Sequence, residues 1–378
     1  MKAAKRHSKA EEFTMRQDRI IEQPESDMNP LKARPPLSFE FRTILYEKDQ
    51  PISGCARITI NRPGSYNAYS TGTLQELTAA FGDAALDDAI GAIVYTGAGD
   101  RAFCTGGDVK EYSEDYVARP RHYWKYMGLF RGYIEGILNC GKPVIARLNG
   151  MAVGGGNESQ LACDLSLAAE HAVLRQVGVQ VGSVAAGGAT QWLPLAIGDR
   201  RARWMLMTGE PVPAVRAEEW GLINRAVPSV RRGTSWVEKA TQEEIKSALA
   251  GRDGLTIDLT RLDEEVSALA RKLLESFPEC MRYTKQQVNV HKEMSWHQTI
   301  GHAREWLALH YTHWEPIEGM NAFVEKRRPD YAKLRAEAAS DRWSETPWGP
   351  GVKSCGACGT SGLPEGFRHC GSCGAEIS

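Results

Sequence analysis

The chain has 378 residues, of which 42% are hydrophobic and 25% are charged. This length is enough for a large hydrophobic core with additional segments around it. The net charge of −1 provides no basic excess of the kind that attracts nucleic acids or anionic membrane surfaces, and no hydrophobic stretch approaches the length of a membrane-spanning helix. We therefore expect neither nucleic acid nor a membrane as a partner.

The N-terminal stretch 1–37 is charged and lacks the hydrophobic region of a secretory signal. We expect an exposed arm here, which either wraps around a neighbouring subunit or is disordered. After it, strands and helices alternate in the order that is typical of an α/β fold. Strands are predicted at 39–46, 56–60, 92–97, 143–149 and 165–169, and helices at 72–86, 123–139 and 155–162.

The chain becomes helical after residue 227. Segments 260–276 and 294–311 carry hydrophobic residues at three- and four-residue spacing, which predicts helices. Before them, segment 229–259 is an insertion rich in charged and small residues. It forms either a lid over a substrate or a solvated surface segment.

An aromatic cluster lies in the middle of the first half, in the sequence YSEDYVARPRHYWKYM at 112–127. Its members Tyr112, Tyr116 and Trp124 have two possible roles. They line a substrate pocket, or they belong to the stripe of a helix that faces the core.

Two glycine-rich loops follow predicted strands and contain an acidic residue near their ends. They are AGDRAFCTGGD at 98–108 and LNGMAVGGGNE at 148–158. Backbone without Cβ atoms can present N–H groups to a ligand at close range, and a helix N-terminus adds its positive end. This pattern predicts an oxyanion hole, with Glu158 placed to move a proton or hold a water molecule. The alternative is a glycine hinge that only closes a strand-to-helix turn.

Four motifs, in this order and spacing, resemble the successive signatures of the crotonase, or enoyl-CoA hydratase, superfamily. They are INRPGSYNAYS (60–70), RAFCTGGDVKE (101–111), NGMAVGGGNE (149–158) and FVEKRRPDY (323–331). The resemblance covers about residues 40–335. It implies an α/β fold in which ββα units form a spiral followed by C-terminal helices, in a catalytic domain at 38–340. It also implies an acyl-CoA substrate, no further cofactor for catalysis, and a homo-oligomer that is a trimer or a dimer of trimers.

The resemblance also assigns roles to individual residues. Gly107 and Gly155 should donate their backbone N–H groups to the thioester oxygen, and Glu158 falls on the first of the two glutamates of enoyl-CoA hydratases. Tyr311 matches a tyrosine that reaches the substrate from a neighbouring subunit in related synthases. The residues expected to contact the substrate or its CoA are Tyr66, Asn67, Ala68, Thr105, Gly106, Asp108, Val153, Gly154, Gly178, Ser183, Tyr311 and Lys326.

One position departs from the hydratase pattern. The second hydratase glutamate falls on Gly178, so a hydration in which two carboxylates share one water cannot be assumed. The surrounding sequence RQVGVQVGS (175–183) resembles dihydroxynaphthoyl-CoA synthases and ring-cleaving ketocyclohexanoyl-CoA hydrolases, which also have glycine there. The synthases, however, have aspartate at the place of Ala185 and no glutamate at the place of Glu158.

The resemblance therefore implies a hydrolase, with hydratase activity, that opens the ring of a cyclic β-oxo acyl-CoA in anaerobic aromatic degradation. Two alternatives stay open. One is a plain enoyl-CoA hydratase that acts on linear thioesters. The other is a non-catalytic binding protein of this fold.

Four cysteines near the C-terminus form two C-x-x-C pairs within CGACG and CGSCG. Cys355, Cys358, Cys370 and Cys373 have the spacing of a zinc ribbon, which would comprise residues 355–378 after a linker at 341–354. Four thiolates fill a tetrahedral shell, so the expected Zn²⁺ is structural. A disulfide or redox pair is the alternative. The five other cysteines are scattered, which favours a reducing compartment and hence the cytoplasm.

Overall fold

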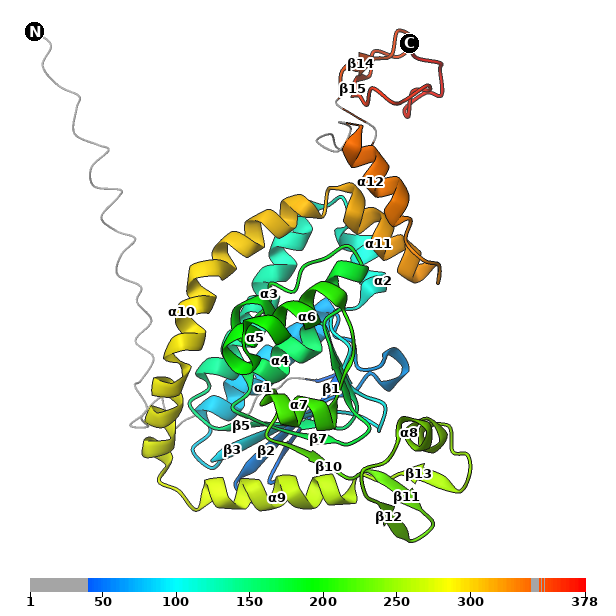
Figure 1. The fold of residues 1–378 in the computed structure, drawn as a ribbon. Coiled ribbons are helices and arrows are strands. Elements are labelled where there is room, and N and C mark those ends of the chain that lie inside the picture. The colour runs from blue at the N-terminus through cyan, green and yellow to red at the C-terminus, as the bar shows by residue number, and fades with distance from the viewer. Residues whose placement is uncertain (1–39, 341–346, 348, 350) are drawn as a thin grey trace, which may run out of the picture. The chain divides into compact units, whose positions relative to one another are not determined.

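The computed structural model describes residues 40–340, 347, 349 and 351–378 (Figure 1). The predicted arm at 1–37 and most of the predicted linker lie outside the described residues. Six strands form the central sheet in the order β1-β2-β3-β5-β7-β10. Strand β1 is antiparallel to β2, and all other neighbours are parallel. The strands are β1 (Ile44–Lys48), β2 (Cys55–Ile60), β3 (Ala92–Gly97), β5 (Val144–Leu148), β7 (Leu165–Ala169) and β10 (Arg225–Val227).

A second sheet consists of short strands in the order β4-β6-β8-β9. Its members are β4 (Ala102–Cys104), β6 (Met151–Val153), β8 (Val173–Arg175) and β9 (Val212–Pro213). Along the chain, β4 follows β3, β6 follows β5 and β8 follows β7. The repeating unit is thus one strand from each sheet followed by a helix, which confirms the predicted crotonase-type α/β fold. Because β4 and β6 are parallel neighbours, the loops that leave them lie side by side.

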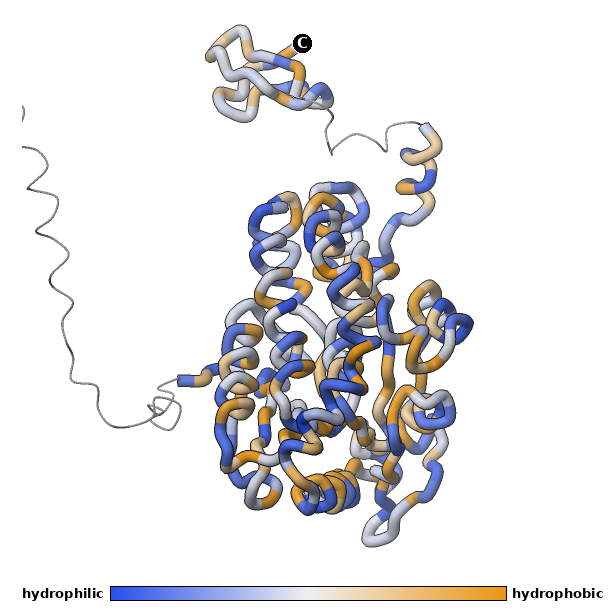
Figure 2. The backbone as a smooth tube through the Cα atoms, turned by 90° about the vertical axis from the view of Figure 1, so that its left-hand side faces the viewer, coloured by the Kyte–Doolittle hydropathy of each residue, from blue (hydrophilic) through white to orange (hydrophobic). Residues whose placement is uncertain are grey.

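Helices cover both faces of the central sheet. On one face pack α1 (Thr71–Leu86) and α3 (Pro120–Asn139), and on the other packs α9 (Thr260–Leu274). In β3, Ile93 and Tyr95 belong to the first hydrophobic cluster and Val94 to the second, as the two-residue period of a strand requires. Figure 2 shows that hydrophobic and hydrophilic residues alternate along the coiled segments, as expected of helices with one face on the core.

The remaining helices follow the two sheets or connect their strands. They are α2 (Val109–Glu111), α4 (Gly155–Ala162), α5 (Ala189–Ile197), α6 (Asp199–Thr208), α7 (Ala214–Trp220), α8 (Gln242–Leu249), α10 (Pro278–His310), α11 (Trp314–Val324) and α12 (Tyr331–Ala339). Among the helices of the described residues, none combines the length and hydrophobicity needed to cross a membrane.

Most predicted boundaries lie within three residues of the observed ones, but two elements begin far from their predicted start. Strand β1 begins at Ile44 and not at 39, and α10 begins at Pro278 and not at 294. The first turns of α10 were missed because their hydrophobic side chains are exposed and polar ones are buried. Val288 is 70% exposed, whereas the Lys285 ammonium is buried against Asp164 at 2.9 Å. Such an inverted pattern gives no amphipathic signal.

The predicted insertion is a compact unit with its own core. It contains an antiparallel sheet of β11 (Val230–Arg232), β12 (Ser235–Val237) and β13 (Leu255–Ile257), against which α8 packs. Val230, Ile245, Ala248 and Leu255 are buried within it. The segment therefore forms a folded unit with a small hydrophobic core.

The C-terminal cysteines belong to a small unit with a two-stranded sheet and its own core. Strand β14 (Lys353–Ser354) is antiparallel to β15 (Ser361–Leu363). The unit thus begins before Cys355, within the stretch that was predicted to be linker. Its core consists of Cys355, Leu363, Cys370 and Ile377.

Candidate active site

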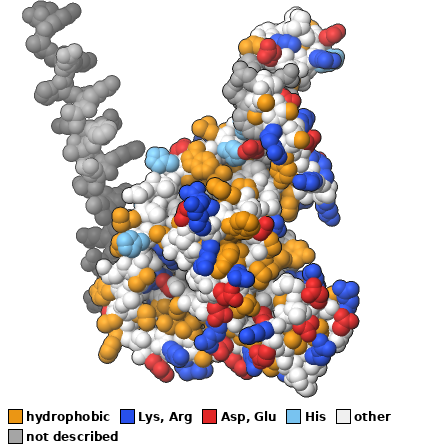
Figure 3. Space-filling model, viewed as in Figure 1, with side chains coloured by type: hydrophobic (Ala, Val, Ile, Leu, Met, Phe, Trp, Pro, Cys, Tyr) orange, Lys and Arg blue, Asp and Glu red, His pale blue; other side chains and the backbone are white. Residues whose placement is uncertain are grey.

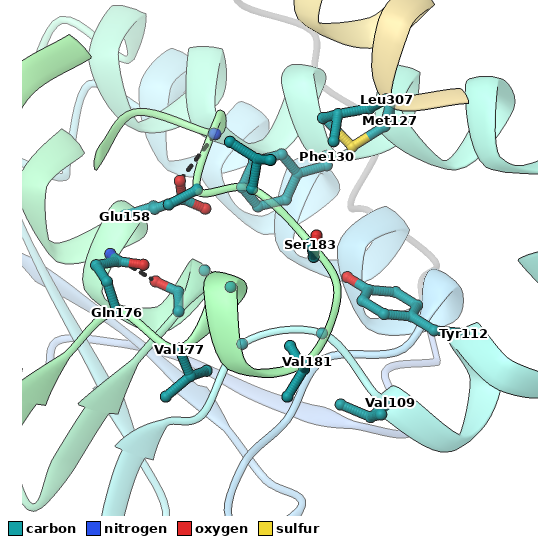
Figure 4. Close-up of a pocket in the computed structure, with 18 of the residues that line it drawn as sticks. Val109, Tyr112, Met127, Phe130, Glu158, Gln176, Val177, Val181, Ser183 and Leu307 are labelled. Atoms are coloured by element: carbon teal, nitrogen blue, oxygen red, sulfur yellow. Dashed lines mark hydrogen bonds between the residues drawn. The ribbon is translucent and has the colours of Figure 1, made fainter. Parts of the chain in front are cut away.

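A pocket lies where the loops after β4, β6 and β8 meet helices α3, α10 and α11 (Figure 4). It brings both predicted glycine loops together with Glu158. Thirteen further side chains of the lining are hydrophobic or aromatic, and no lining residue comes from segment 229–259. The lining includes Tyr69, Thr105, Gly106, Gly107, Val109, Tyr112, Tyr123, Tyr126, Met127, Phe130, Gly154, Gly155, Glu158, Gln176, Gly178, Ser183 and Leu307.

The two predicted oxyanion donors occupy equivalent places in the two loops. Each follows a glycine with positive φ, 90° at Gly106 and 54° at Gly154, a conformation that side chains other than glycine rarely adopt. Among the described residues, the N–H groups of Gly107 and Gly155 donate to no acceptor. Both N–H groups are thus available to one ligand oxygen, as an oxyanion hole requires.

Glu158 lies on the first turn of α4 and is only 6% exposed. Its Oε1 accepts hydrogen bonds from the Gly187 N–H at 2.8 Å and the Ala189 N–H at 3.3 Å. Burial raises the pKa of Glu158 to about 7, although both hydrogen bonds lower it. A carboxyl group with this pKa can both accept and return a proton near neutral pH.

Gly178 lies on the pocket wall at the start of the 3-10 helix η3 (Gly178–Gln180). A Cβ atom there would come within 2.8 Å of the Ser183 backbone oxygen, so even a small side chain would displace the wall. The neighbouring Val177 and Val181 are hydrophobic (Figure 4). Glu158 is therefore the one carboxylate among the residues that line this pocket.

Other predicted contact residues lie in or near the pocket. Thr105, Gly106, Gly154 and Ser183 line it, and Val153 lies immediately before the second loop. Tyr311 lies one layer behind the wall. Its fully buried ring stacks on that of Tyr123 of the same chain, with 3.7 Å between the ring centroids.

The remaining predicted residues do not line the pocket. The buried Asn67 side chain donates to the backbone oxygens of Ala98 and Ala102 at 2.9 and 2.7 Å, so it holds the first loop in place. Asp108 pairs with Arg62 at 2.9 Å and caps α2. Ala68 is buried between these elements, while Tyr66 and Lys326 are exposed.

The aromatic cluster divides between the two predicted roles. Tyr112 lines the pocket, Tyr116 is buried behind it, and Trp124 is 38% exposed with the Arg304 guanidinium above its ring. Sequence reasoning missed the roles of Tyr123, Tyr126, Met127 and Phe130 of α3. Their spacing of three and four residues predicts one helix face, but this face covers both the core and the pocket.

The four C-terminal cysteines converge as predicted. Their sulfur atoms all lie within 4.8 Å of one another, and the Cys355–Cys373 and Cys358–Cys370 pairs are each 3.6 Å apart. Thiolates at about 2.3 Å from one zinc ion stand roughly 3.8 Å apart at the corners of a tetrahedron. The cluster therefore fits a tetrahedral metal ion.

Known proteins are similar to this chain over most of its length. Residues 51–252 match the sequence model of the family described as enoyl-CoA hydratase/isomerase. The chain is 38% identical to 6-oxocyclohex-1-ene-1-carbonyl-CoA hydrolase of Geobacter metallireducens, over 78% of this chain and 82% of that protein. It is 33% identical to the protein of the same name from Thauera aromatica, over 84% and 90% of the two chains.

A solved structure agrees with the fold. An enoyl-CoA hydratase/isomerase from Mycobacterium paratuberculosis matches with a TM-score of 0.62 and 27% identity, over 75% of this chain and 99% of that one. The chain therefore belongs to the enoyl-CoA hydratase/isomerase, or crotonase, family of enzymes.

Proposed function

We propose that this protein hydrates 6-oxocyclohex-1-ene-1-carbonyl-CoA and opens its ring to give 3-hydroxypimeloyl-CoA, in the anaerobic degradation of benzoyl-CoA. The observation that carries the proposal is a pocket with two unpaired glycine amides and one carboxylate, Glu158. A hydratase that shares one water between two carboxylates would need a second one at Gly178. The choice of the ring substrate rests on the names of the two relatives, both 6-oxocyclohex-1-ene-1-carbonyl-CoA hydrolases.

In the first step, water adds across the conjugated C=C bond. Glu158 accepts a proton from the water, whose oxygen bonds to the β-carbon of the thioester. The electron pair of the C=C bond moves toward the thioester oxygen, which becomes the enolate oxygen. The Gly107 and Gly155 amides hold this oxygen, and each donor lowers the barrier by about 3 kcal/mol. A proton then returns to the α-carbon.

In the second step, another water adds to the ring ketone. The bond between the ketone carbon and the α-carbon then breaks, and its electron pair forms the same thioester enolate. The former ketone carbon becomes the new carboxylate, and the α-carbon is protonated. One oxyanion hole thus serves both steps, and Glu158 handles the water in at least one of them.

Turnover of 6-oxocyclohex-1-ene-1-carbonyl-CoA in water labelled with heavy oxygen tests this proposal. Mass analysis should show two labelled oxygens in the product, one in the hydroxyl and one in the carboxylate. A single labelled oxygen would restrict the enzyme to one of the two steps, and none would refute the substrate. Faster turnover of crotonyl-CoA than of the ring substrate would favour a plain hydratase of linear thioesters.

We also propose that Cys355, Cys358, Cys370 and Cys373 bind one structural Zn²⁺. The sulfur separations support a tetrahedral ion, and four thiolates leave no position for a substrate. Metal analysis of the purified protein should give one zinc per chain. Replacement of Cys358 by Ser should reduce this content, whereas replacement of the exposed Cys280, which is outside the cluster, should not. Equal zinc contents in the two variants would refute the site.

Finally, we propose a cytoplasmic homo-oligomer, a trimer or a dimer of trimers. Four of the five cysteines outside the cluster are buried as free thiols, which suits a reducing compartment. The face drawn in Figure 3 carries a hydrophobic area near its middle, where Figure 1 places α5 and α6. On these helices Leu195, Trp204 and Met207 are 59%, 55% and 66% exposed. Exposed hydrophobic residues of this size favour a subunit interface.

A further inference from the structure

Two tyrosine hydroxyls touch the two glycines of the oxyanion hole, one each. A methyl group on Gly155 would come within 1.7 Å of the Tyr69 hydroxyl oxygen, and one on Gly107 within 1.8 Å of the Tyr112 hydroxyl oxygen. Each hydroxyl therefore lies directly against the Cα atom that bears a donating N–H group. Both tyrosines line the pocket.

The backbone and ring of Tyr69 are firmly held. Its N–H donates to the Gly106 oxygen at 2.9 Å and its carbonyl accepts from the Asp108 N–H at 3.0 Å, so its backbone fixes the first glycine loop. Its ring is 2% exposed and stacks on Phe130 with 5.8 Å between centroids. One residue thus joins both loops, through its backbone to the first and through its hydroxyl to the second.

The two hydroxyls differ in their partners. The Tyr112 hydroxyl shares a hydrogen bond with that of Tyr126, which also lines the pocket. The Tyr69 hydroxyl makes no hydrogen bond within the described part of the chain. Burial raises the pKa of Tyr69 and Tyr112 well above 10, so both hydroxyls stay neutral and can donate a hydrogen bond to an oxygen in the pocket.

We propose that the hydroxyls of Tyr69 and Tyr112 form a second oxygen-binding subsite, which holds the ring ketone of a β-oxo thioester. The inference rests on the proposed function. In such a substrate both carbonyl carbons are bonded to the same α-carbon, so both oxygens can lie on one side. With the thioester oxygen between the Gly107 and Gly155 amides, the ketone oxygen lies within reach of groups that contact these same glycines.

The subsite acts in the ring-opening step. Addition of water to the ketone carbon breaks the C=O π bond and leaves its electron pair on the ketone oxygen, where the tyrosine hydroxyls stabilise it by hydrogen bonding. When the ring C–C bond breaks, the pair returns to re-form C=O and the cleaved pair moves to the thioester enolate. Figure 4 shows Glu158 and Tyr112 on different sides of the cavity. The water can therefore be bound by one wall of the pocket and the ketone oxygen by another.

A kinetic comparison tests the subsite, with Tyr69→Phe as the principal variant. It should slow ring opening by on the order of 10²-fold, because it removes one donor from a developing oxyanion. The hydrated cyclic intermediate should accumulate with one labelled oxygen. Hydration of cyclohex-1-ene-1-carbonyl-CoA, which has no ketone, should change by only a few fold. An equal loss with both substrates, or no loss of ring opening, would overturn the proposal.

Tyr95→Phe is the matched control. The Tyr95 side chain is fully buried and its hydroxyl is bonded to that of Tyr133, but it does not line the pocket. This variant should retain ring opening. A ring-opening defect in Tyr95→Phe as large as in Tyr69→Phe would assign the effect to packing and reject the subsite.

A binding measurement separates failure of the subsite from failure of the proposed function. In a Glu158→Gln background, 2-oxocyclohexane-1-carbonyl-CoA should bind more tightly than cyclohexane-1-carbonyl-CoA, and Tyr69→Phe should abolish most of this preference. If the wild type does not turn over the 6-oxo substrate but the preference depends on Tyr69, the subsite stands and the function fails. If the wild type turns over the 6-oxo substrate and the binding preference for the 2-oxo thioester does not depend on Tyr69, only the subsite proposal is refuted.

Discussion

Glu158 experiences opposing electrostatic effects. Its place on the first turn of α4 and its two backbone hydrogen bonds favour the carboxylate, whereas removal from water favours the neutral acid. Burial prevails and raises the pKa of Glu158 to about 7. The structure therefore places a carboxyl group with a near-neutral pKa in the same pocket as the two glycine amides that we propose as the oxyanion hole.

The first prediction concerns catalysis by Glu158. Because the base must be deprotonated, kcat/KM for ring-substrate turnover should rise about tenfold per pH unit below 7 and level off above it. Glu158→Gln should lower kcat by roughly 10²- to 10⁴-fold with little change in thioester binding. Glu170 is a suitable control, since it is equally buried but does not line the pocket. Unchanged turnover in Glu158→Gln would remove the assigned role.

The second prediction concerns stability. The folded-state pKa of Glu158 lies above its usual value of 4.5, so the folded protein binds the extra proton between pH 4.5 and 7. The free energy of unfolding should therefore fall as pH rises through this window, by about 3 kcal/mol for this group. Urea unfolding of the wild type and Glu158→Gln at pH 5 and 8 measures the effect. The variant should gain stability relative to the wild type at pH 8, and a difference that does not depend on pH would contradict the assignment.

At the scale of elements, the site depends on two parallel neighbours. Strands β4 and β6 each end in a glycine loop, and their pairing brings the two N–H donors together. The sequence predicted both loops, and the strands at 92–97 and 165–169 match β3 and β7 in full. Hydrophobic runs of strand length between glycines and polar residues identify such buried strands well.

Other elements could not be read from the sequence. The first half of α10 was missed because Lys285 is buried and Val288 is exposed, which reverses the usual pattern. Tyr69 was missed as a pocket residue because no sequence pattern around it indicates contact with a ligand. Its contact with Gly155 joins residues far apart in the sequence, and only the pairing of the loops creates it. The spacing of hydrophobic residues along α3 likewise predicts one buried helix face. It does not predict that this face covers the pocket as well as the core.

The third prediction concerns the second loop. Gly154 has φ of 54° and ψ of −123°, so alanine would be strained there by about 1–3 kcal/mol. Gly154→Ala should also lower kcat, because it tilts the Gly155 amide. Gly132 in α3 is a matched control, since a Cβ atom there meets nothing within 4 Å. Gly132→Ala should stabilise the protein by about 0.5–1 kcal/mol. Thermal unfolding and kcat should be measured for both variants. Equal stability and equal kcat in Gly154→Ala and Gly132→Ala would contradict a requirement for the positive φ at Gly154.

At the scale of the whole molecule, we expect the cysteine cluster to be separate from the catalytic chemistry. No residue of 351–378 lines the pocket. A chelator should therefore expose the four cluster thiols to a thiol reagent while kcat of the full-length protein is retained. Activity and oligomeric state should be followed in the same sample. Loss of activity at an unchanged oligomeric state would refute a purely structural metal ion.

The fifth prediction, the second at this scale, joins assembly to activity. A groove beside α6 is lined by Gly178, Val184 and Ala185, which also line the pocket, and by Met207 on its outer side. A subunit that packs on α6 would therefore support the thin pocket wall at Gly178. Introduction of glutamate at Trp204 and Met207 should dissociate the oligomer and lower kcat together.

Light scattering with chromatography and an activity assay at the same protein concentration measure both effects. Phe277→Glu is the control, because Phe277 is 81% exposed but lies outside the groove. This variant should keep both the assembly and the activity. If the Trp204 and Met207 variant is monomeric but fully active, the wall at Gly178 is stable without a neighbour and the interface has no part in catalysis. Dissociation that also impairs ring opening would show that the glycine at 178, which leaves no room for a second carboxylate, depends on a second subunit for its rigidity.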